Sequence, residues 1–279
     1  MKSILIPTDF SDNAGDALAY TLGLVGHQPV RVHILHVVEP NVTSPGLSVV
    51  TTDLITAQLD DARTNMQALE GFSQTTLADQ GKTNVKVTTN VAVGTTSATL
   101  QAEAKEIHAD AIIMGTQGSN HSTVEKVLGT VSTNVIREAP CPVILVPRGY
   151  VFKVIDTALF ATSLDHSDPY ELWRATELIK PHLSVVRCLH VVKDRVSKND
   201  AALEAFAKYM VEHSPAIQTI FHIELGQNIE ATIAEYAKDY DAELIIMHRA
   251  KRNLWETIFG PSHTKRMVFK LKVPLLVLN

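Results

Sequence analysis

The sequence predicts an α/β fold made of two tandem, doubly wound sheets, each mostly parallel, five-stranded and covered by helices on both faces. Three observations predict it. Short apolar runs alternate with helical patterns along the chain, which is the rhythm of βαβ units. The apolar runs are continuous rather than alternating, as in strands that are buried on both faces. The whole pattern then occurs a second time, so we expect two similar domains.

The positions of these runs predict the individual elements. In the first copy, strands are expected near residues 2–7, 31–38, 84–92, 111–115 and 143–147, and helices near 12–26, 52–80, 96–108 and 123–138. In the second copy, strands are expected near residues 156–161, 185–192, 217–224, 243–247 and 274–278. Ser11 or Asp12 is the expected N-cap of the first helix, and Ser167 or Asp168, before Pro169, opens its counterpart.

Short matching segments align the two copies. ILHVV at residues 34–38 matches CLHVV at 188–192, DAIIMG at 110–115 matches AELIIMH at 242–248, and CPVILVP at 141–147 matches VPLLVLN at 273–279. The second copy is shorter, mainly opposite residues 40–70. We therefore expect one domain over residues 1–148 and another over residues 152–279.

Composition and charge exclude several classes of protein. Of the 279 residues, 20% are charged and 45% are apolar, and the net charge is −5, as in a globular protein of about two domains. The two cysteines, Cys141 and Cys188, exclude a disulfide framework and four-cysteine metal sites, and the 12 histidines form no HExxH or similar ligand set. The chain is acidic, has no apolar run of about 18 residues and begins without a signal-peptide pattern. We therefore expect a cytoplasmic protein without a metal site, a membrane span or a nucleic-acid partner.

Parallel sheets of this kind bind ligands beyond the carboxyl ends of their strands, so the loops after residues 7, 38 and 114 are the informative ones. The first of them reads Pro7-Thr8-Asp9-Phe10-Ser11. The Asp9 carboxylate is suited either to accept hydrogen bonds from a ribose or an adenine amine, or to cap the following helix. The residues alone leave both roles open.

Glycines mark the third of these loops. It reads Met114-Gly115-Thr116-Gln117-Gly118 and is followed, after ten residues, by Gly129-Thr130-Val131-Ser132 at a helix start. Glycines let backbone N–H groups approach a phosphate, and a helix N-terminus adds further donors and a favourable dipole. A polyphosphate site is one interpretation, and a pair of tight turns before a helix is the other. The pattern is neither a P-loop nor a Rossmann fingerprint.

Several motifs together resemble one known family. The PTDFS start, the LHVV strand, the MGTxG loop, the later GT-x-S and the closing CPVILVP resemble the universal stress protein family, and the duplication resembles its tandem two-domain members. The resemblance covers essentially the whole chain and implies a Rossmann-like fold. ATP-binding members carry G-x2-G-x9-G-[S/T], which Gly115, Gly118, Gly129 and Thr130 match, except that ten residues separate the second and third glycines.

The resemblance also implies ATP or ADP, with or without Mg²⁺, as the ligand. By that resemblance Asp9 contacts the ribose or adenine end, the backbone of Val37 or Val38 contacts the adenine edge, and the phosphates lie on Gly115, Gly118, Gly129, Thr130 and Ser132. Neighbouring residues of the same motifs complete the implied site: Pro7, Thr8, Met114, Gln117 and Val131. With the resemblance, a ligand contact becomes the favoured role of Asp9.

The second copy lacks these features. Ser163 stands where the first copy has Asp9, and Met247-His248-Arg249-Ala250-Lys251 replaces the glycine loop. Gly260 matches Gly129, but Pro261 follows it and has no N–H to donate. We expect the second domain not to bind ATP in the family manner. A different anion, held by Arg249, Lys251 and Arg252, is the alternative.

The favoured function is an ATP- or ADP-binding regulatory protein of the stress response, with the nucleotide in the N-terminal domain and a structural second domain. In the family that the chain resembles, the last strands can pair between domains, and by that resemblance the candidates here are Val143–Val146 and Leu275–Leu278, in a monomer that forms a pseudo-dimer or in a homodimer. The residues indicate a binding protein rather than an enzyme. The alternatives are a slow ATPase or self-phosphorylating protein, and a nucleotide-independent interaction or dimerisation module. No sequence feature identifies the protein partner.

Overall fold

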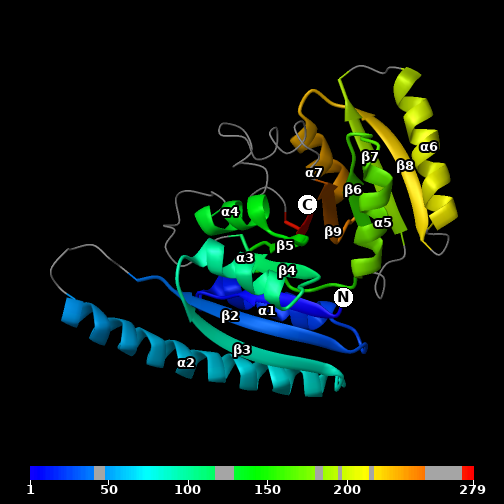
Figure 1. The fold of residues 1–279 in the computed structure, drawn as a ribbon. Coiled ribbons are helices and arrows are strands. Elements are labelled where there is room, and N and C mark those ends of the chain that lie inside the picture. Colours follow the sequence, from blue (N-terminus) through cyan, green and yellow to red (C-terminus); the bar gives the residue numbers. More distant parts are fainter. Residues whose placement is uncertain (41–47, 117–128, 180–184, 194–196, 214–216, 249–271) are drawn as a thin grey trace.

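The described strands of both repeats form one ten-stranded sheet (Figure 1). The computed structural model describes residues 1–40, 48–116, 129–179, 185–193, 197–213, 217–248 and 272–279. The first repeat contributes β1 (Ser3–Pro7), β2 (Val30–Val38), β3 (Val85–Val93), β4 (Ala111–Gly115) and β5 (Val143–Val146). The second contributes β6 (Thr157–Ala161), β7 (Val185–Val192), β8 (Gln218–Leu225), β9 (Leu244–His248) and β10 (Leu275–Leu278). The predicted α/β fold is confirmed, and its two five-stranded sheets are joined edge to edge.

Helices cover both faces of the sheet. The described helices are α1 (Asp12–Leu24), α2 (Ser48–Asp79), α3 (Thr96–Glu106), α4 (Thr130–Glu138), α5 (Asp168–Ile179), α6 (Ser197–His213) and α7 (Ile229–Asp239). Buried residues of α1, α2, α5 and α6 share one hydrophobic core, and those of α3, α4 and α7 share a second core on the opposite face. Strands between these two layers are buried on both sides, which explains their continuous apolar runs. None of the described helices is both long and apolar enough to cross a membrane.

Both repeats have the same strand order. Across the sheet the order is β3-β2-β1-β4-β5-β10-β9-β6-β7-β8, and neighbouring strands within a repeat are parallel. In each repeat the second and third strands lie on one side of the first strand, and the fourth and fifth strands lie on its other side. This reversal opens a crevice at the carboxyl ends of the first and fourth strands, where α/β proteins bind their ligands.

The two repeats meet at an antiparallel pair of strands. β10 pairs with β5, and Leu276 lies opposite Ile144. Both side chains are fully buried and belong to the same core. The Asn279 side-chain amide extends the contact by donating to the carbonyl oxygens of Ala139, at 3.0 Å, and Cys141, at 2.8 Å. The predicted pairing of these strands is confirmed, and it makes the hydrophobic core continuous across both repeats.

The segment that connects the repeats packs against α1. The ring centroids of Tyr150 and Phe152 lie 5.9 Å and 5.5 Å from that of Tyr20. A Cβ atom on Gly23 would lie only 2.5 Å from the Phe152 ring, so the ring needs the space that a glycine leaves. Because Ile155 is fully buried as well, the connection is fixed to the first repeat before β6 begins.

The observed strand bounds agree with the sequence predictions to within one residue, but two helices begin elsewhere. α2 begins at Ser48 rather than near residue 52. α4 begins at Thr130 rather than at 123, because Gly129 has an extended backbone and is the N-cap; residues 123–128 lie outside the described residues. Ser11 is the N-cap of α1, and its hydroxyl accepts from the Ala14 N–H. In the second repeat, Asp168 is already the first residue of α5.

Shortening Leu276 to alanine should destabilise the whole chain, because its buried side chain lies at the joint between the repeats. We expect Leu276→Ala to lower the free energy of unfolding by about 2–5 kcal/mol, measured by urea denaturation followed by circular dichroism. Leu54→Ala is the matched control, since Leu54 on α2 is 59% exposed. A loss at Leu276 no larger than the loss at Leu54 would contradict a shared core.

Candidate functional site

A cavity of about 460 Å³ opens at the carboxyl ends of β1, β2 and β4. Its floor comes from those strand ends, and the first turns of α3 and α4 form part of its wall. The lining residues are Pro7, Thr8, Asp9, Ala14, Leu35, His36, Val37, Glu39, Thr96, Leu100, Met114, Gly115, Gly129, Thr130, Val131 and Ser132. The cavity therefore lies at the crevice that the strand order creates.

The loop after β1 is held by hydrogen bonds between its own residues. The Thr8 hydroxyl accepts from the Phe10 N–H at 3.1 Å, and Phe10 has a positive φ of 61°. The Asp9 carboxylate accepts from the Ser11 N–H at 3.1 Å and from its hydroxyl at 2.6 Å. Ser11, and not Asp9, is thus the helix cap. The exposed Asp9 side chain is oriented by Ser11 at the mouth of the cavity.

The imidazole of His36 supports the same loop from β2. Its Nδ1 atom lies 2.8 Å from the Thr8 carbonyl oxygen. Because a carbonyl oxygen only accepts, Nδ1 carries the proton in this contact. The ring also lies 4.4 Å, centroid to centroid, from that of Phe10. Together these contacts fix the position of the loop on the end of β2.

Helix α4 begins at the cavity without a side-chain cap. Its N-cap is Gly129, which has no side chain to accept from the first N–H groups of the helix. Thr130, Val131 and Ser132 of this first turn line the cavity. The first turn of a helix has the equivalent of about half a positive charge. The cavity is therefore bounded on this side by backbone donors and a positive dipole, which suit an anion.

The end of β4 lies very close to the start of α1. A Cβ atom on Gly115 would lie 2.7 Å from the side chain of Asn13 and 2.8 Å from its carbonyl oxygen. The same Asn13 side chain donates to the Val146 carbonyl oxygen at 3.2 Å and accepts from the Thr116 hydroxyl at 3.4 Å. Only a glycine at position 115 allows α1 to lie this close to the end of β4.

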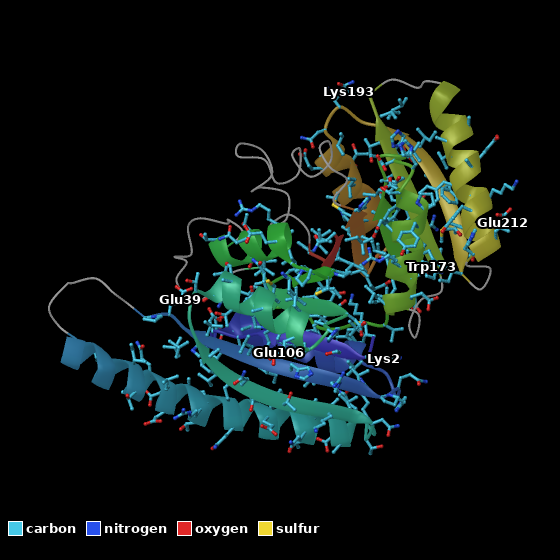
Figure 2. The ribbon with its side chains drawn as sticks, in the orientation of Figure 1. Lys2, Glu39, Glu106, Trp173, Lys193 and Glu212 are labelled. Carbon is cyan, nitrogen blue, oxygen red and sulfur yellow. The ribbon has the colours of Figure 1, made fainter. Side chains whose placement is uncertain are left out.

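The opposite side of the cavity has a second helix start, which is already capped. The Glu39 carboxylate, just after β2, accepts from the Thr96 N–H at 2.7 Å. Hydrogen bonds from the Thr96 side chain and backbone lower the pKa of Glu39, so this carboxylate stays ionised at neutral pH. Glu39 and Glu106 are labelled near opposite ends of α3 in Figure 2. The α3 start therefore offers a negative charge where the α4 start offers a positive one.

The structure brings most of the predicted site residues to this one cavity. Those that line it are Pro7, Thr8, Asp9, Val37, Met114, Gly115, Gly129, Thr130, Val131 and Ser132. Val38 is buried and is not among the lining residues, and its carbonyl oxygen accepts from the Gly94 N–H at 3.0 Å. Gln117 and Gly118 lie outside the described residues, as does the ten-residue spacer after them. Val37 is thus the better placed of the two alternatives on β2.

Sequence reasoning missed several residues that line the same cavity: Ala14, Leu35, His36, Glu39, Thr96 and Leu100. Glu39 and Thr96 could have been found by the rule that ligands bind beyond the carboxyl ends of strands, because each follows such an end. The loop between β3 and α3 contains no recognisable ligand-binding motif. Leu35 and Leu100 belong to the apolar core, and nothing in their spacing distinguishes a cavity wall from ordinary core.

The second repeat keeps the turn but changes what surrounds it. Thr162 accepts from the Leu164 N–H at 2.9 Å, and Leu164 has a φ of 59°. His190 Nδ1 lies 2.9 Å from the Thr162 carbonyl oxygen, as His36 does in the first repeat. The same backbone turn, with a bulky residue at positive φ, therefore occurs in both copies. The replacement of Asp9 by Ser163 and of Gly115 by His248 has not altered this part of the fold.

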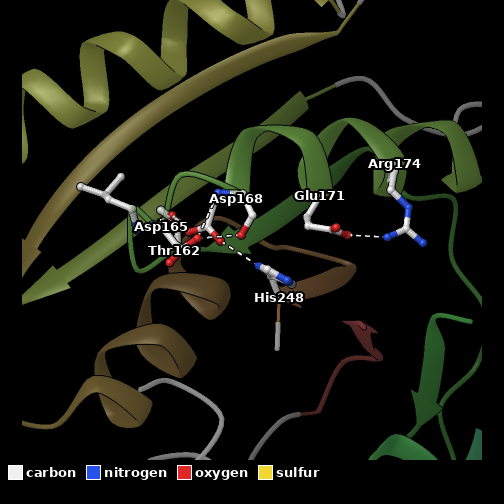
Figure 3. A network of polar contacts seen from close by, with 8 residues as sticks. Thr162, Asp165, Asp168, Glu171, Arg174 and His248 are labelled. Atoms are coloured by element: carbon white, nitrogen blue, oxygen red, sulfur yellow. Dashed lines mark hydrogen bonds and ion pairs between the residues drawn. The ribbon is translucent and has the colours of Figure 1, made fainter. Parts of the chain in front are cut away.

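A buried acid–base pair occupies the end of β9 (Figure 3). His248 ends β9 as Gly115 ends β4, and its Nδ1 atom lies 3.1 Å from the Asp168 carboxylate. Asp168 is 1% exposed and also accepts from the Thr162 hydroxyl at 2.5 Å and the Asp165 N–H at 3.2 Å. The crevice of the second repeat thus contains a fully hydrogen-bonded carboxylate and an imidazole, where the first repeat has an amide and a glycine.

Thiol chemistry does not belong to this site. Both cysteines are buried, and burial raises the pKa of Cys141 to about 12 and that of Cys188 well above its usual range. A thiol that stays protonated is a poor nucleophile.

Among the described residues, no three His, Cys, Asp or Glu side chains are grouped so as to hold a metal ion. The basic segment with Arg249, Lys251 and Arg252, proposed above as an anion site, lies outside the described residues.

Removing the Asp168 carboxylate should destabilise the second repeat, because one buried donor and two partly buried donors would lose their acceptor. We expect Asp168→Ala to lower the free energy of unfolding by about 2–4 kcal/mol, and Asp168→Asn to lower it less. Asp156→Ala, at an exposed position, is the control in the same urea titration. Equal losses in the two alanine variants would show that the pair with His248 is not structural.

The two thiols should be unreactive in the folded chain. At mildly alkaline pH we expect Ellman's reagent to label neither Cys141 nor Cys188 until denaturant is added, and then to label both. Rapid labelling of the native protein would mean that one of these thiols is exposed or activated, against the burial described here.

Comparison with known proteins agrees with the fold and the motifs. The universal stress protein family model matches residues 1–147 and again residues 156–279. Universal stress protein Sll1654 of Synechocystis is 34% identical over 146 residues, which is 52% of this chain and 85% of that relative. Universal stress protein MJ0531 of Methanocaldococcus jannaschii is 29% identical over 150 residues, 53% of this chain and 82% of the relative.

A solved structure resembles the chain along its whole length. A universal stress protein from Archaeoglobus fulgidus superimposes with a TM-score of 0.72 at 21% identity, covering 99% of this chain and 98% of its own. At that identity the likeness shows a common fold of both repeats. Because the family model also matches both repeats, the chain belongs to the universal stress protein family, as a tandem member.

Proposed function

We propose that this protein binds ATP or ADP in its first repeat and acts as a nucleotide-dependent regulatory protein in the stress response. The observation that carries the proposal is the uncapped start of α4, which opens onto the cavity at the ends of β1 and β4. Backbone donors and the helix dipole there suit phosphate oxygens. The glycine at the end of β4 and the GT-x-S turn are the motif positions at which ATP-binding members of the family hold phosphates.

The size of the cavity suits a nucleotide lying across the strand ends. Its volume of about 460 Å³ is within the usual range of small-molecule sites. β2 and β4 are two strand spacings apart in the sheet, which is about 10 Å. Phosphates on α4 would leave the ribose beside Asp9 at the end of β1. The base would then reach the apolar wall of Val37, Leu100 and Met114.

The two ends of the glycine loop are joined by a hydrogen bond, which supports the proposal although ten residues rather than nine separate Gly118 from Gly129. The Gly129 N–H donates to the Thr116 carbonyl oxygen at 3.1 Å, so the loop leaves and returns at the same place. Gly115 and Gly129 both line the cavity. This hydrogen bond between the flanking residues holds the start of α4 beside the end of β4. Mg²⁺, when present, would arrive with the phosphates.

The second repeat has a structural role in this proposal. In the equivalent crevice, the buried Asp168 carboxylate already accepts from three donors. A phosphate beside it would meet a negative charge, since Asp168 is 1% exposed and little screened by water. We therefore propose residues 1–148 as the nucleotide domain. Residues 152–279 form a partner domain that covers its β5 edge and leaves one nucleotide site per chain.

Titration calorimetry with ATP and ADP tests the proposal, together with mass spectrometry of any nucleotide released from the purified protein. We expect about one nucleotide per chain, and a nucleotide at 100 times its Kd should add about 2.7 kcal/mol to stability. A phosphate-release assay in the same samples separates binding from hydrolysis. Absence of heat and of any thermal shift would leave a nucleotide-independent interaction module. Two nucleotides per chain would contradict a structural second repeat.

Proline at position 130 should weaken nucleotide binding without disturbing the fold. Thr130 is the first residue of α4, where proline fits a helix but removes one N–H donor, as Pro261 does after Gly260 in the second repeat. We expect Thr130→Pro to raise the Kd for ADP about tenfold, equivalent to about 1.4 kcal/mol, with an unchanged Tm.

Thr130→Ala is the matched control, because it removes the hydroxyl and keeps the N–H. An equal loss of affinity in both variants would assign the effect to the hydroxyl and contradict a backbone contact. An unchanged Kd in the proline variant would place the phosphates elsewhere in the cavity.

A further inference from the structure

The two helix starts at the cavity differ in charge. α4 begins with Gly129 and has no side-chain cap, whereas the Thr96 N–H at the start of α3 donates to Glu39 at 2.7 Å. The N-cap residue of α3, Thr95, makes no side-chain cap of its own. Glu39 therefore performs the capping from β2. It brings a full negative charge to a helix end that would otherwise favour an anion.

A second carboxylate lies on the same side of the cavity. Asp9 follows β1 and Glu39 follows β2, and these strands are neighbours in the sheet. Both carboxylates line the cavity, and the described lining residues include no lysine or arginine to balance them. The cavity is thus acidic at the ends of β1 and β2 and positive at the start of α4. A ligand with one anionic end and one uncharged, donor-rich end matches this distribution.

We propose that Glu39 is a specificity-determining residue, which restricts the site to nucleotides whose phosphates are all on the 5′ side of the ribose. The inference rests on the proposed function, because it assumes that the 5′-phosphates lie on α4. The ribose hydroxyls then lie between Asp9 and Glu39. A phosphate on the 3′ oxygen would be placed beside two carboxylates, at a helix start whose donor is already used by Glu39.

The exposure of the two carboxylates limits how strongly they repel a 3′-phosphate. Asp9 and Glu39 are exposed, so water and salt screen their repulsion of a phosphate. The fixed hydrogen bond of Glu39 to Thr96 prevents the carboxylate from turning away without uncapping α3. We therefore expect a selectivity of about tenfold from repulsion at short range, and we expect added salt to reduce it.

The test compares ADP with adenosine 3′-phosphate 5′-diphosphate by titration calorimetry. The two probes have the same base and the same 5′ group, and they differ only in the 3′-phosphate. The variants are Glu39→Gln, which keeps an oxygen to accept from the Thr96 N–H, and Glu106→Gln as the control. Glu106 is an exposed residue at the far end of α3, so the control removes one negative charge from the opposite end of the helix that Glu39 caps (Figure 2).

We expect the wild-type protein to bind ADP about ten times more tightly than its 3′-phosphorylated form. Glu39→Gln should reduce this ratio to about threefold or less, while Glu106→Gln keeps the wild-type ratio; each ratio compares the two probes on the same variant, so a change in the Kd for ADP alone does not alter it. Equal wild-type affinities for the two probes would overturn the proposal without any variant. An unchanged ratio in Glu39→Gln, or an equal reduction in Glu106→Gln, would also overturn it. Failure of the wild-type protein to bind ADP at all would instead refute the proposed function.

Discussion

The N-cap of α4, Gly129, has no side chain to satisfy the first N–H groups of the helix, and the candidate site depends on this. Gly129 caps the helix with backbone alone, so the donors of the first turn are directed to whatever enters the cavity. This helix start lies at the cavity because the Ser132 hydroxyl donates to the Gly115 carbonyl oxygen at 3.2 Å and the Gly129 N–H donates to the Thr116 carbonyl oxygen at 3.1 Å. Gly115 also lets Asn13 of α1 lie against the end of β4. Asn13 in turn holds the Val146 carbonyl oxygen at the end of β5. One close backbone approach therefore aligns α1, β4 and β5 around the same opening.

The two repeats show that this fold can lose the close approach at a glycine and keep its architecture. The loops after β1 and β6 have the same hydrogen bonds and the same positive φ at Phe10 and Leu164. What differs is the pair at the end of the fourth strand, where Asp168 and His248 form a buried contact. In the second repeat the side chains of Asp168 and His248 thus occupy the place where Gly115 and Asn13 lie close together in the first. The second repeat still contributes its β10 edge, which pairs with β5 and continues the core of the first.

Much of this could be predicted from the sequence. Continuous apolar runs located the strands because the strands are buried on both faces, and the resemblance to the universal stress protein family indicated the joint between β5 and β10. Helix α4 begins where the Gly129-Thr130 motif indicated a helix start, because Gly129 has an extended backbone. The wider range expected from residue 123 includes residues 123–128, which lie outside the described residues. The strand-end rule could have found Glu39 as a lining residue, but its capping role depends on Thr96, which is 57 positions away in sequence. The Asp168–His248 contact likewise joins two distant motifs, and no local pattern predicts such a pair.

The most direct test of this account is the NMR response of the backbone amides of Thr130, Val131 and Ser132 to added ADP. The account predicts large amide shifts and slower hydrogen exchange at these residues, because their N–H groups would donate to phosphate oxygens. Amides around Asp168 and His248 should not respond. If ADP binds while the α4 amides stay unchanged, the phosphates do not lie at the helix start, and the central claim is wrong.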